Sequence, residues 1–318
     1  MASAEVGDNV LDGDPTIRAL EERAATVLGM PAALWTPSGT MANVIALSLH
    51  LERGDRFLAP KDAHVLNSEL GSAAWLAGGM PYALEHDAGP GRPKVETLAK
   101  AIGPRNVPYY LLRTALLCLE NTHNAAGGAI IPPHEHAQLL ATARRAGLRV
   151  HLDGARLWHA AVALGLPPAA LTVGVDSVSA CFSKGLGAPV GSVVAGNVTF
   201  VERARRMRQM LGGGVRQGGV LAAAALVALD RIGDLEGDHE KARRLAAGLA
   251  DLGWEVDTPE TNIVVARVAD ISVTLESLTA IGVLAMSTGT RVRFVAHRDL
   301  SVDDIDEALM RIKAGGHP

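Results

Sequence analysis

The chain has 318 residues, which is long enough for a large core and predicts two lobes. Hydrophobic residues make up 48% of the sequence and aromatic residues only 3%, so we expect a core of Ala, Leu and Val. The formal net charge of −4 argues against a nucleic-acid or membrane-surface partner. No apolar run is long enough to span a membrane and no signal peptide opens the chain, which predicts a cytoplasmic protein. Cys118 and Cys181 lie in apolar runs that are typical of buried free thiols.

Strand and helix patterns alternate after a polar N-terminal segment, residues 1–15. Asp14–Pro15 has the form of a turn, and Thr16 is expected to cap a helix over 16–28. The alternation predicts an α/β fold with a mostly parallel sheet and helices on both faces. We expect further helices at 40–51, 68–77, 134–146 and 156–164, and strands at 32–35, 56–59, 81–84, 109–120, 149–152, 175–180 and 193–195.

The pattern changes in the last third of the chain. Residues 201–245 are helical apart from the segment GGGVRQGG. We therefore predict a large domain over residues 1–235 and a small C-terminal α+β domain over residues 236–318. Within the small domain, strands are expected at 254–256, 262–268 and 291–296, and helices near 271–281 and 301–313.

Lys184 is the principal candidate for chemistry. It lies in the segment FSKGLG, after a short apolar run and beside small residues that would admit a flat cofactor. An amine buried there loses hydration, so its pKa falls and it can attack a carbonyl group. On its own such a lysine is more often a solvated loop residue. Together with Asp153 in HLDGAR and the Ser-Gly-Thr turn in TPSGTMAN, it completes the set of groups expected of a pyridoxal phosphate site.

The other groups of this set also lie where predicted strands end, and ligands of parallel sheets gather there. A carboxylate at Asp153 can keep a pyridine nitrogen protonated, although the residue could instead cap the next helix. The backbone amides of Ser38, Gly39 and Thr40 would face a phosphate from a helix N-terminus, although this turn too could be only a cap.

An arginine and two histidines are further candidates. Arg156 follows Asp153 by three residues, so it can face the same cleft and bind a substrate carboxylate, unless it forms a surface ion pair. His64 and His123 follow strand-like runs, where an imidazole can stack on a flat cofactor or transfer a proton. A purely structural histidine is the alternative for each.

Several segments, in order from about residue 4 to the C-terminus, resemble the low-specificity L-threonine aldolases, which belong to the fold-type-I (aspartate aminotransferase-like) pyridoxal phosphate enzymes. The resemblance implies that fold, with pyridoxal 5'-phosphate as cofactor. The segments are GDPTIRALEERAATVLG, TPSGTMANVIAL, ENTHNAAGGAIIP, HLDGARLWHAAVALG, FSKGLGAPVGSVVAG, GGGVRQGG, ETNIVV and RFVAHRDLS.

The resemblance also implies roles for individual residues. Lys184 would bind the cofactor covalently, Asp153 would pair with its ring nitrogen, and His64 would stack on its ring. The phosphate would be held by Ser38, Gly39, Thr40 and Ser183. His123 would be a candidate base beside the substrate hydroxyl. Arg156, next to the cofactor, and Arg293 would bind the amino acid carboxylate, and Arg216 would reach the phosphate of a neighbouring subunit. The family is commonly a tetramer of two dimers with shared active sites, and no metal is expected.

The chain departs from the family pattern at the rim of the expected site. The family usually begins with a segment like DLRSDTVT, whose serine helps to hold the substrate carboxylate, and this chain starts after it. Leu11 stands where relatives have a tyrosine, and Gln209 stands where a lysine is common. After His64 the chain reads VLNSE where the family tends to have aromatic residues.

These observations predict a pyridoxal phosphate-dependent carbon–carbon lyase. It would cleave L-threonine, L-allo-threonine or a related β-hydroxy-α-amino acid to glycine and an aldehyde, as a cytoplasmic homotetramer. One alternative is another reaction on the same cofactor, such as β-elimination or racemisation. A second alternative is a non-catalytic homologue, which the departures at the N-terminus would favour and the presence of Lys184, Asp153, Arg156 and Arg293 argues against.

Overall fold

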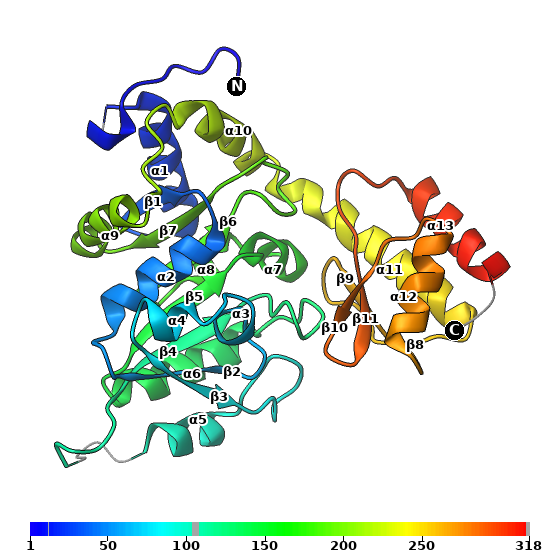
Figure 1. The fold of residues 1–318 in the computed structure, drawn as a ribbon, viewed down its shortest axis with the longest axis horizontal. Helices are drawn as coiled ribbons and strands as arrows, with labels where there is room; N and C mark the ends of the chain where they lie inside the picture. Colours follow the sequence, from blue (N-terminus) through cyan, green and yellow to red (C-terminus); the bar gives the residue numbers. More distant parts are fainter. Residues whose placement is uncertain (12, 104–107, 316–318) are drawn as a thin grey trace.

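The larger part of the molecule is built on a seven-stranded sheet with the strand order β1-β7-β6-β5-β4-β2-β3 (Figure 1). The computed structural model describes residues 1–11, 13–103 and 108–315. β7 runs antiparallel to both of its neighbours, and the pairs from β6 to β3 are parallel. The expected mostly parallel α/β fold is thus confirmed. The strands are β1 (Ala32–Thr36), β2 (Arg56–Pro60), β3 (Met80–Leu84), β4 (Thr114–Glu120), β5 (Arg149–Gly154), β6 (Ser177–Cys181) and β7 (Ser192–Gly196).

Helices cover both faces of this sheet, because successive residues of a strand point to opposite sides. In β1, Ala33 and Trp35 join the core on one face, and Leu34 packs into the core on the other. The first face is covered by α1 (Pro15–Leu28), α5 (Val95–Ile102), α6 (Pro133–Arg145), α7 (Leu157–Leu164), α8 (Pro168–Leu171) and α10 (Gly219–Leu229). The second face is covered by α2 (Gly39–His50), α3 (His64–Asn67), α4 (Ser72–Trp75) and α9 (Val198–Met210).

A second, antiparallel sheet with the order β10-β11-β9-β8 forms the smaller part. Figure 1 shows α11 (Leu235–Asp251) running from the larger part to this sheet. A separate hydrophobic core begins at Ala242, while the exact boundary near residue 235 stays a prediction. The remaining elements are β8 (Glu255–Val256), β9 (Ile263–Arg267), α12 (Ile271–Ala280), β10 (Met286–Thr288), β11 (Arg291–Val295) and α13 (Val302–Gly315).

Two expected elements of the larger part are wrong in extent. The strand expected at 109–120 begins only at Thr114, because its neighbour β2 begins opposite Thr114 and its neighbour β5 opposite Leu116. Arg113 still bonds β2, because its carbonyl accepts from the Arg56 amide at 2.8 Å, but the residues before it lie beyond the start of both neighbouring strands, and Tyr109 is fully exposed. The helix expected at 68–77 is instead the short helix α4, which begins at Ser72 after Gly71 at a positive φ of 72°, and the separate short helix α3 has already ended at Asn67.

Sequence analysis also missed β10 in the smaller sheet, because this strand has only three residues and little apolar alternation. Cys118 and Cys181 are buried and free, as expected. Within the described residues, no helix has the length and apolar character needed to cross a membrane.

Asp14 caps α1, so the expectation of a Thr16 cap after a simple turn was wrong. Pro15 is the first helical residue, where its missing N–H is no loss. The buried Asp14 carboxylate accepts hydrogen bonds from the amides of Ile17 at 2.9 Å, Gly219 at 2.9 Å and Gly7 at 3.2 Å. It therefore ties the N-terminal segment, α1 and α10 together.

We expect Asp14→Ala to lower the free energy of unfolding by about 2–4 kcal/mol, because it removes a helix cap and leaves buried amides unpaired. The matched control is Asp270→Ala, which removes the exposed cap of α12 and its single side-chain bond to the Val273 amide. That change should cost about 1 kcal/mol. Urea unfolding of both variants measures the difference, and equal losses would contradict the tying role of Asp14.

Candidate active site

Asp153 lies at the carboxyl end of β5 and points to the α2 side of the sheet. Val150 and Leu152 of the same strand lie in the core on the opposite face, so the intervening side chains must face α2. The buried carboxylate accepts hydrogen bonds from the Asn43 side chain at 2.8 Å and the Ala155 amide at 3.0 Å. It forms no ion pair among the residues that the structure describes. Because α7 begins at Leu157, Asp153 does not cap that helix.

Asn43, on α2, joins Asp153 to His64 through a second carboxylate. Its amide nitrogen donates to Asp153 and also to Glu69 at 2.8 Å, and Glu69 accepts from His64 Nδ1 at 2.8 Å. Its amide oxygen accepts from the Ser179 hydroxyl at 2.8 Å and from His151 Nε2 at 3.1 Å. All hydrogen-bonding groups of this buried amide are therefore satisfied, which fixes its orientation.

The charge on this side of the site is negative. The hydrogen bond from His64 Nδ1 to the Glu69 carboxylate raises the pKa of His64 against the effect of burial, and the charge of Asp153 raises it further. His64 can contribute at most one positive charge against the two buried carboxylates of Glu69 and Asp153, so the cluster can accept one more positive charge. Burial raises the pKa of the nearby Cys118 thiol well above its usual value, and the charges of the surrounding carboxylates raise it further. A protonated pyridine nitrogen at Asp153 fits this balance.

Lys184 leaves the sheet at the same edge as Asp153. In the parallel pair of β5 and β6, Asp153 lies opposite Ser179, and the loop that carries Lys184 begins three residues after Ser179. The Lys184 side chain is half-buried and makes no hydrogen bond or ion pair with any described residue. The charges of Lys184, Asp153 and Arg156 all act on the buried Cys181 thiol, whose pKa is raised mainly by burial. The amine therefore lies at the same edge of the sheet as the carboxylate cluster and is available for covalent binding.

The turn of Ser38, Gly39 and Thr40 begins α2 and fits a phosphate. Ser38 caps the helix by accepting from the Met41 amide at 3.1 Å, so the cap interpretation is also confirmed. The Gly39 and Thr40 amides make no hydrogen bond with a described residue and lie at the positive end of the helix dipole. A Cβ at Gly39 would lie 2.8 Å from Cys181 Sγ, so only glycine allows this close approach.

Arg156 and Arg293 converge on one neutral atom, the side-chain oxygen of Asn124, at 2.7 and 2.9 Å. Neither forms an ion pair with a described residue. Burial and then the Arg293 charge lower the pKa of Arg156 to about 10, and burial lowers that of Arg293. The Nε atom of Arg293 is buried and has no hydrogen-bond partner in the described part of the chain. Two cations with no anion to neutralise them are suited to bind a carboxylate.

The remaining predicted residues lie in different situations. His123 is fully buried, and its Nε2 donates to the Lys61 carbonyl at 3.1 Å while its Nδ1 accepts from the Ala126 amide at 3.3 Å. Arg216 is exposed and pairs with Asp8 at 2.6 Å, without a bond to the other candidate residues. Ser183 is exposed beside Lys184. The roles of these residues stay predictions.

Sequence analysis missed Asn43, Glu69 and Asn124. Asn43 carried the clearest signal, because it is a polar residue in the apolar run ANVIAL of a buried helix. Glu69 and Asn124 lie in loops, where spacing alone gives no sign of a partner.

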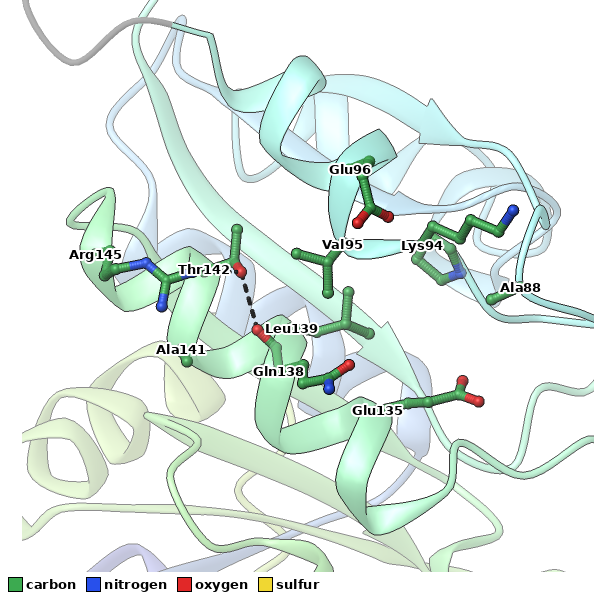
Figure 2. A pocket seen from close by; sticks show the side chains of 11 residues that line it. Ala88, Lys94, Val95, Glu96, Glu135, Gln138, Leu139, Ala141, Thr142 and Arg145 are labelled. Carbon is green, nitrogen blue, oxygen red and sulfur yellow. Dashed lines mark hydrogen bonds between the residues drawn. The ribbon is translucent and has the colours of Figure 1, made fainter.

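A pocket of about 460 Å³ between α5 and α6 is separate from this site. Figure 2 shows Lys94 and Glu96 on one side of it and Gln138, Thr142 and Arg145 on the other. None of the candidate residues lines this pocket, so its presence does not bear on the chemistry.

Comparison with known proteins agrees with the geometry. Residues 1–271 match the family model described as beta-eliminating lyase. The chain is 40% identical over 320 residues to a probable low-specificity L-threonine aldolase 2 of Arabidopsis thaliana, covering 97% of this chain and 90% of the relative. It is 38% identical over 317 residues to the low specificity L-threonine aldolase of Escherichia coli K12, covering 99% and 93%.

Solved structures show the same fold at lower identity. A threonine aldolase of Leishmania major has a TM-score of 0.83 at 19% identity, covering 98% of this chain and 92% of the other. A putative L-allo-threonine aldolase of Listeria monocytogenes has a TM-score of 0.81 at 22% identity, covering 99% and 90%. The sequence match and the site together show that this chain belongs to the beta-eliminating lyase family and is a pyridoxal phosphate-dependent lyase akin to the low-specificity L-threonine aldolases.

Proposed function

We propose that this lyase cleaves L-threonine, L-allo-threonine or a related β-hydroxy-α-amino acid to glycine and an aldehyde. The observation that carries the proposal is the pairing of two unneutralised arginines, Arg156 and Arg293, with an available amine at Lys184 and a buried carboxylate at Asp153. The names of the curated relatives agree with this reaction.

The residues present fit pyridoxal phosphate. Lys184 would hold it covalently, Asp153 would hold its ring nitrogen, His64 would stack on the ring, and the turn at Ser38–Gly39–Thr40 would hold its phosphate. When bound, the cofactor supplies an electron sink for the breaking Cα–Cβ bond. The buried Asp153, fixed by Asn43, maintains the protonation that makes the ring an effective sink.

The chain's own residues orient the substrate and hold protons. Arg156 and Arg293 would bind the substrate carboxylate and so fix which bond is broken. His64 holds a proton at Nδ1 against Glu69. For His123 to accept the proton of the substrate hydroxyl, its Nδ1 must release the 3.3 Å contact with the Ala126 amide.

We also propose a cytoplasmic homotetramer with shared active sites. Exposed apolar side chains lie on and beside the short helices that follow His64, notably Leu70 and Trp75, and would be buried in such an assembly. Arg216, exposed and paired with Asp8, would then turn toward a neighbouring subunit's phosphate site. Sedimentation of the purified protein tests the tetramer.

The proposal predicts that borohydride reduction of the holoenzyme attaches the cofactor to Lys184. Peptide mass mapping locates the attachment, and Lys184→Ala should abolish it because Lys184 lacks an ion-pair partner among the described residues, whereas Lys61, which also follows a parallel strand, pairs with Glu85. Lys61→Ala, which removes an exposed lysine paired with Glu85, is the control and should leave the attachment unchanged. Attachment at a different lysine would overturn the site.

Replacing Arg293 should weaken amino acid binding more than cofactor binding. Loss of one charge-assisted hydrogen bond costs about 1.5–3 kcal/mol, so Arg293→Ala should weaken substrate binding by about 10- to 150-fold. Cofactor absorbance should stay near the wild-type level. The control is Arg267→Ala on β9, whose side chain pairs with Glu255 at the surface. Loss of cofactor with unchanged amino acid affinity would contradict the carboxylate role.

Replacing Glu69 should lower the pKa of His64. In the wild-type protein Asn43 and His64 Nδ1 both bond the same Glu69 oxygen, and in Glu69→Gln the amide oxygen can take its place without the negative charge that favours the protonated ring. In the wild-type protein the raised pKa of His64 adds stability at pH values below its unfolded pKa, and this stability is lost as pH rises through the folded pKa. NMR titration measures the pKa, with the resonance identified by its loss in His64→Gln. Glu85→Gln, at an exposed ion pair, is the control, and equal pKa values in all forms would refute this coupling.

A further inference from the structure

Asn124 is placed where the two parts of the molecule meet. It follows β4, and its backbone amide is fixed by the Glu120 carboxylate at 2.7 Å. Arg156 reaches it from the loop before α7 in the larger part, and Arg293 reaches it from β11 in the smaller sheet. The orientation of the amide is not ambiguous, because guanidinium groups only donate and the oxygen must face both.

The neighbouring residue strengthens the same junction. The Ala125 carbonyl accepts from Arg291 at 3.3 Å and from the Thr288 hydroxyl at 3.4 Å, both from the smaller sheet. The loop is therefore held by the larger part through Glu120 and by the smaller part through β10 and β11. Asn124 lies at a fixed point between the two arginines.

The neutrality of Asn124 has a consequence for charge. A carboxylate at this position would pair with both arginines and satisfy them permanently. An amide oxygen orients the same guanidinium groups but leaves their charge uncompensated. The buried, unpartnered Nε of Arg293 shows that donor capacity remains after the contact with Asn124.

We propose that Asn124 is a positioning residue that holds Arg156 and Arg293, one from each part of the chain, for the substrate carboxylate while keeping both charges available. This inference rests on the proposed function only in taking an α-amino acid as the ligand. It goes further by assigning selectivity for a carboxylate to Asn124, a neutral residue that would not itself contact the ligand's carboxylate.

The test compares two ligands on the holoenzyme, glycine and 1-amino-2-propanol, which has an amine but no carboxylate. Binding is followed by the absorbance change of the cofactor. Asn124→Asp should weaken glycine binding by about tenfold to a hundredfold, because the new carboxylate competes for both arginines. Binding of 1-amino-2-propanol should change less than twofold, and cofactor content should stay at the wild-type level.

Two further variants separate positioning from a general effect on the fold. Asn124→Ser removes the shared acceptor without adding charge, so it should weaken glycine binding by a smaller factor, again with little effect on the amine. Asn67→Asp adds the same charge at an exposed position of α3, where the side chain contacts Asp62 and neither arginine, and it should leave both ligands unaffected. If Asn124→Asp does not fold, the Asn124→Ser result decides alone.

Equal weakening of glycine and 1-amino-2-propanol, or unchanged glycine binding in both Asn124 variants, would overturn the positioning role. The proposed cleavage reaction is judged separately, by product formation from L-threonine with the wild-type enzyme. A wild-type enzyme that binds glycine as expected but does not cleave threonine would refute the reaction and leave the role of Asn124 standing.

Discussion

The buried carboxylate of Asp153 is the constraint on which the rest of the site depends. A buried carboxylate that forms no ion pair with a described residue is costly, and two neutral hydrogen bonds offset only part of that cost. The arrangement is therefore best explained by a positively charged ligand group that completes it. The strand register that turns Asp153 toward α2 also brings Asn43 and the turn that begins this helix to the same side.

The site is divided by charge, and this division suits an α-amino acid bound to pyridoxal phosphate. Carboxylates gather on the Asp153 side, where Glu69 and Asp153 lie beside a single histidine, His64. Two arginines lie together at the other side, where burial and mutual repulsion make an anion favourable. Asn43 and Asn124 serve the two sides alike, because each is a neutral amide that fixes charged groups without neutralising them.

The parts of this site that could be predicted from the sequence are those that depend on strand ends. Asp153, Lys184 and the turn at Ser38 each follow a short apolar run, and a parallel sheet brings such ends to one edge. The elements that were predicted wrongly are those whose ends depend on contacts with residues far away in the sequence. The residues before Arg113 lie beyond the start of both neighbouring strands, and the Asp14 carboxylate that caps α1 is also held by the amides of Gly7 and Gly219.

The amides were missed for a related physical reason. Asn43 and Asn124 act through contacts with residues 26 to 169 positions away, and no local pattern encodes such distances. His123 is the opposite case. Its residue type suggested a base, but both of its ring nitrogens have backbone hydrogen-bond partners in the fold. Residue chemistry indicated which groups could react, and only packing showed which of them are already engaged.

The protonation state of the cofactor's ring nitrogen tests this account most directly. Holoenzyme reconstituted with pyridoxal phosphate labelled with ¹⁵N in the ring should show a protonated nitrogen by NMR in the wild-type protein. In Asp153→Asn, which keeps the shape but removes the charge, the account predicts an unprotonated nitrogen. The same nitrogen chemical shift in both proteins would contradict the claim that the buried Asp153 carboxylate determines the chemistry of the site.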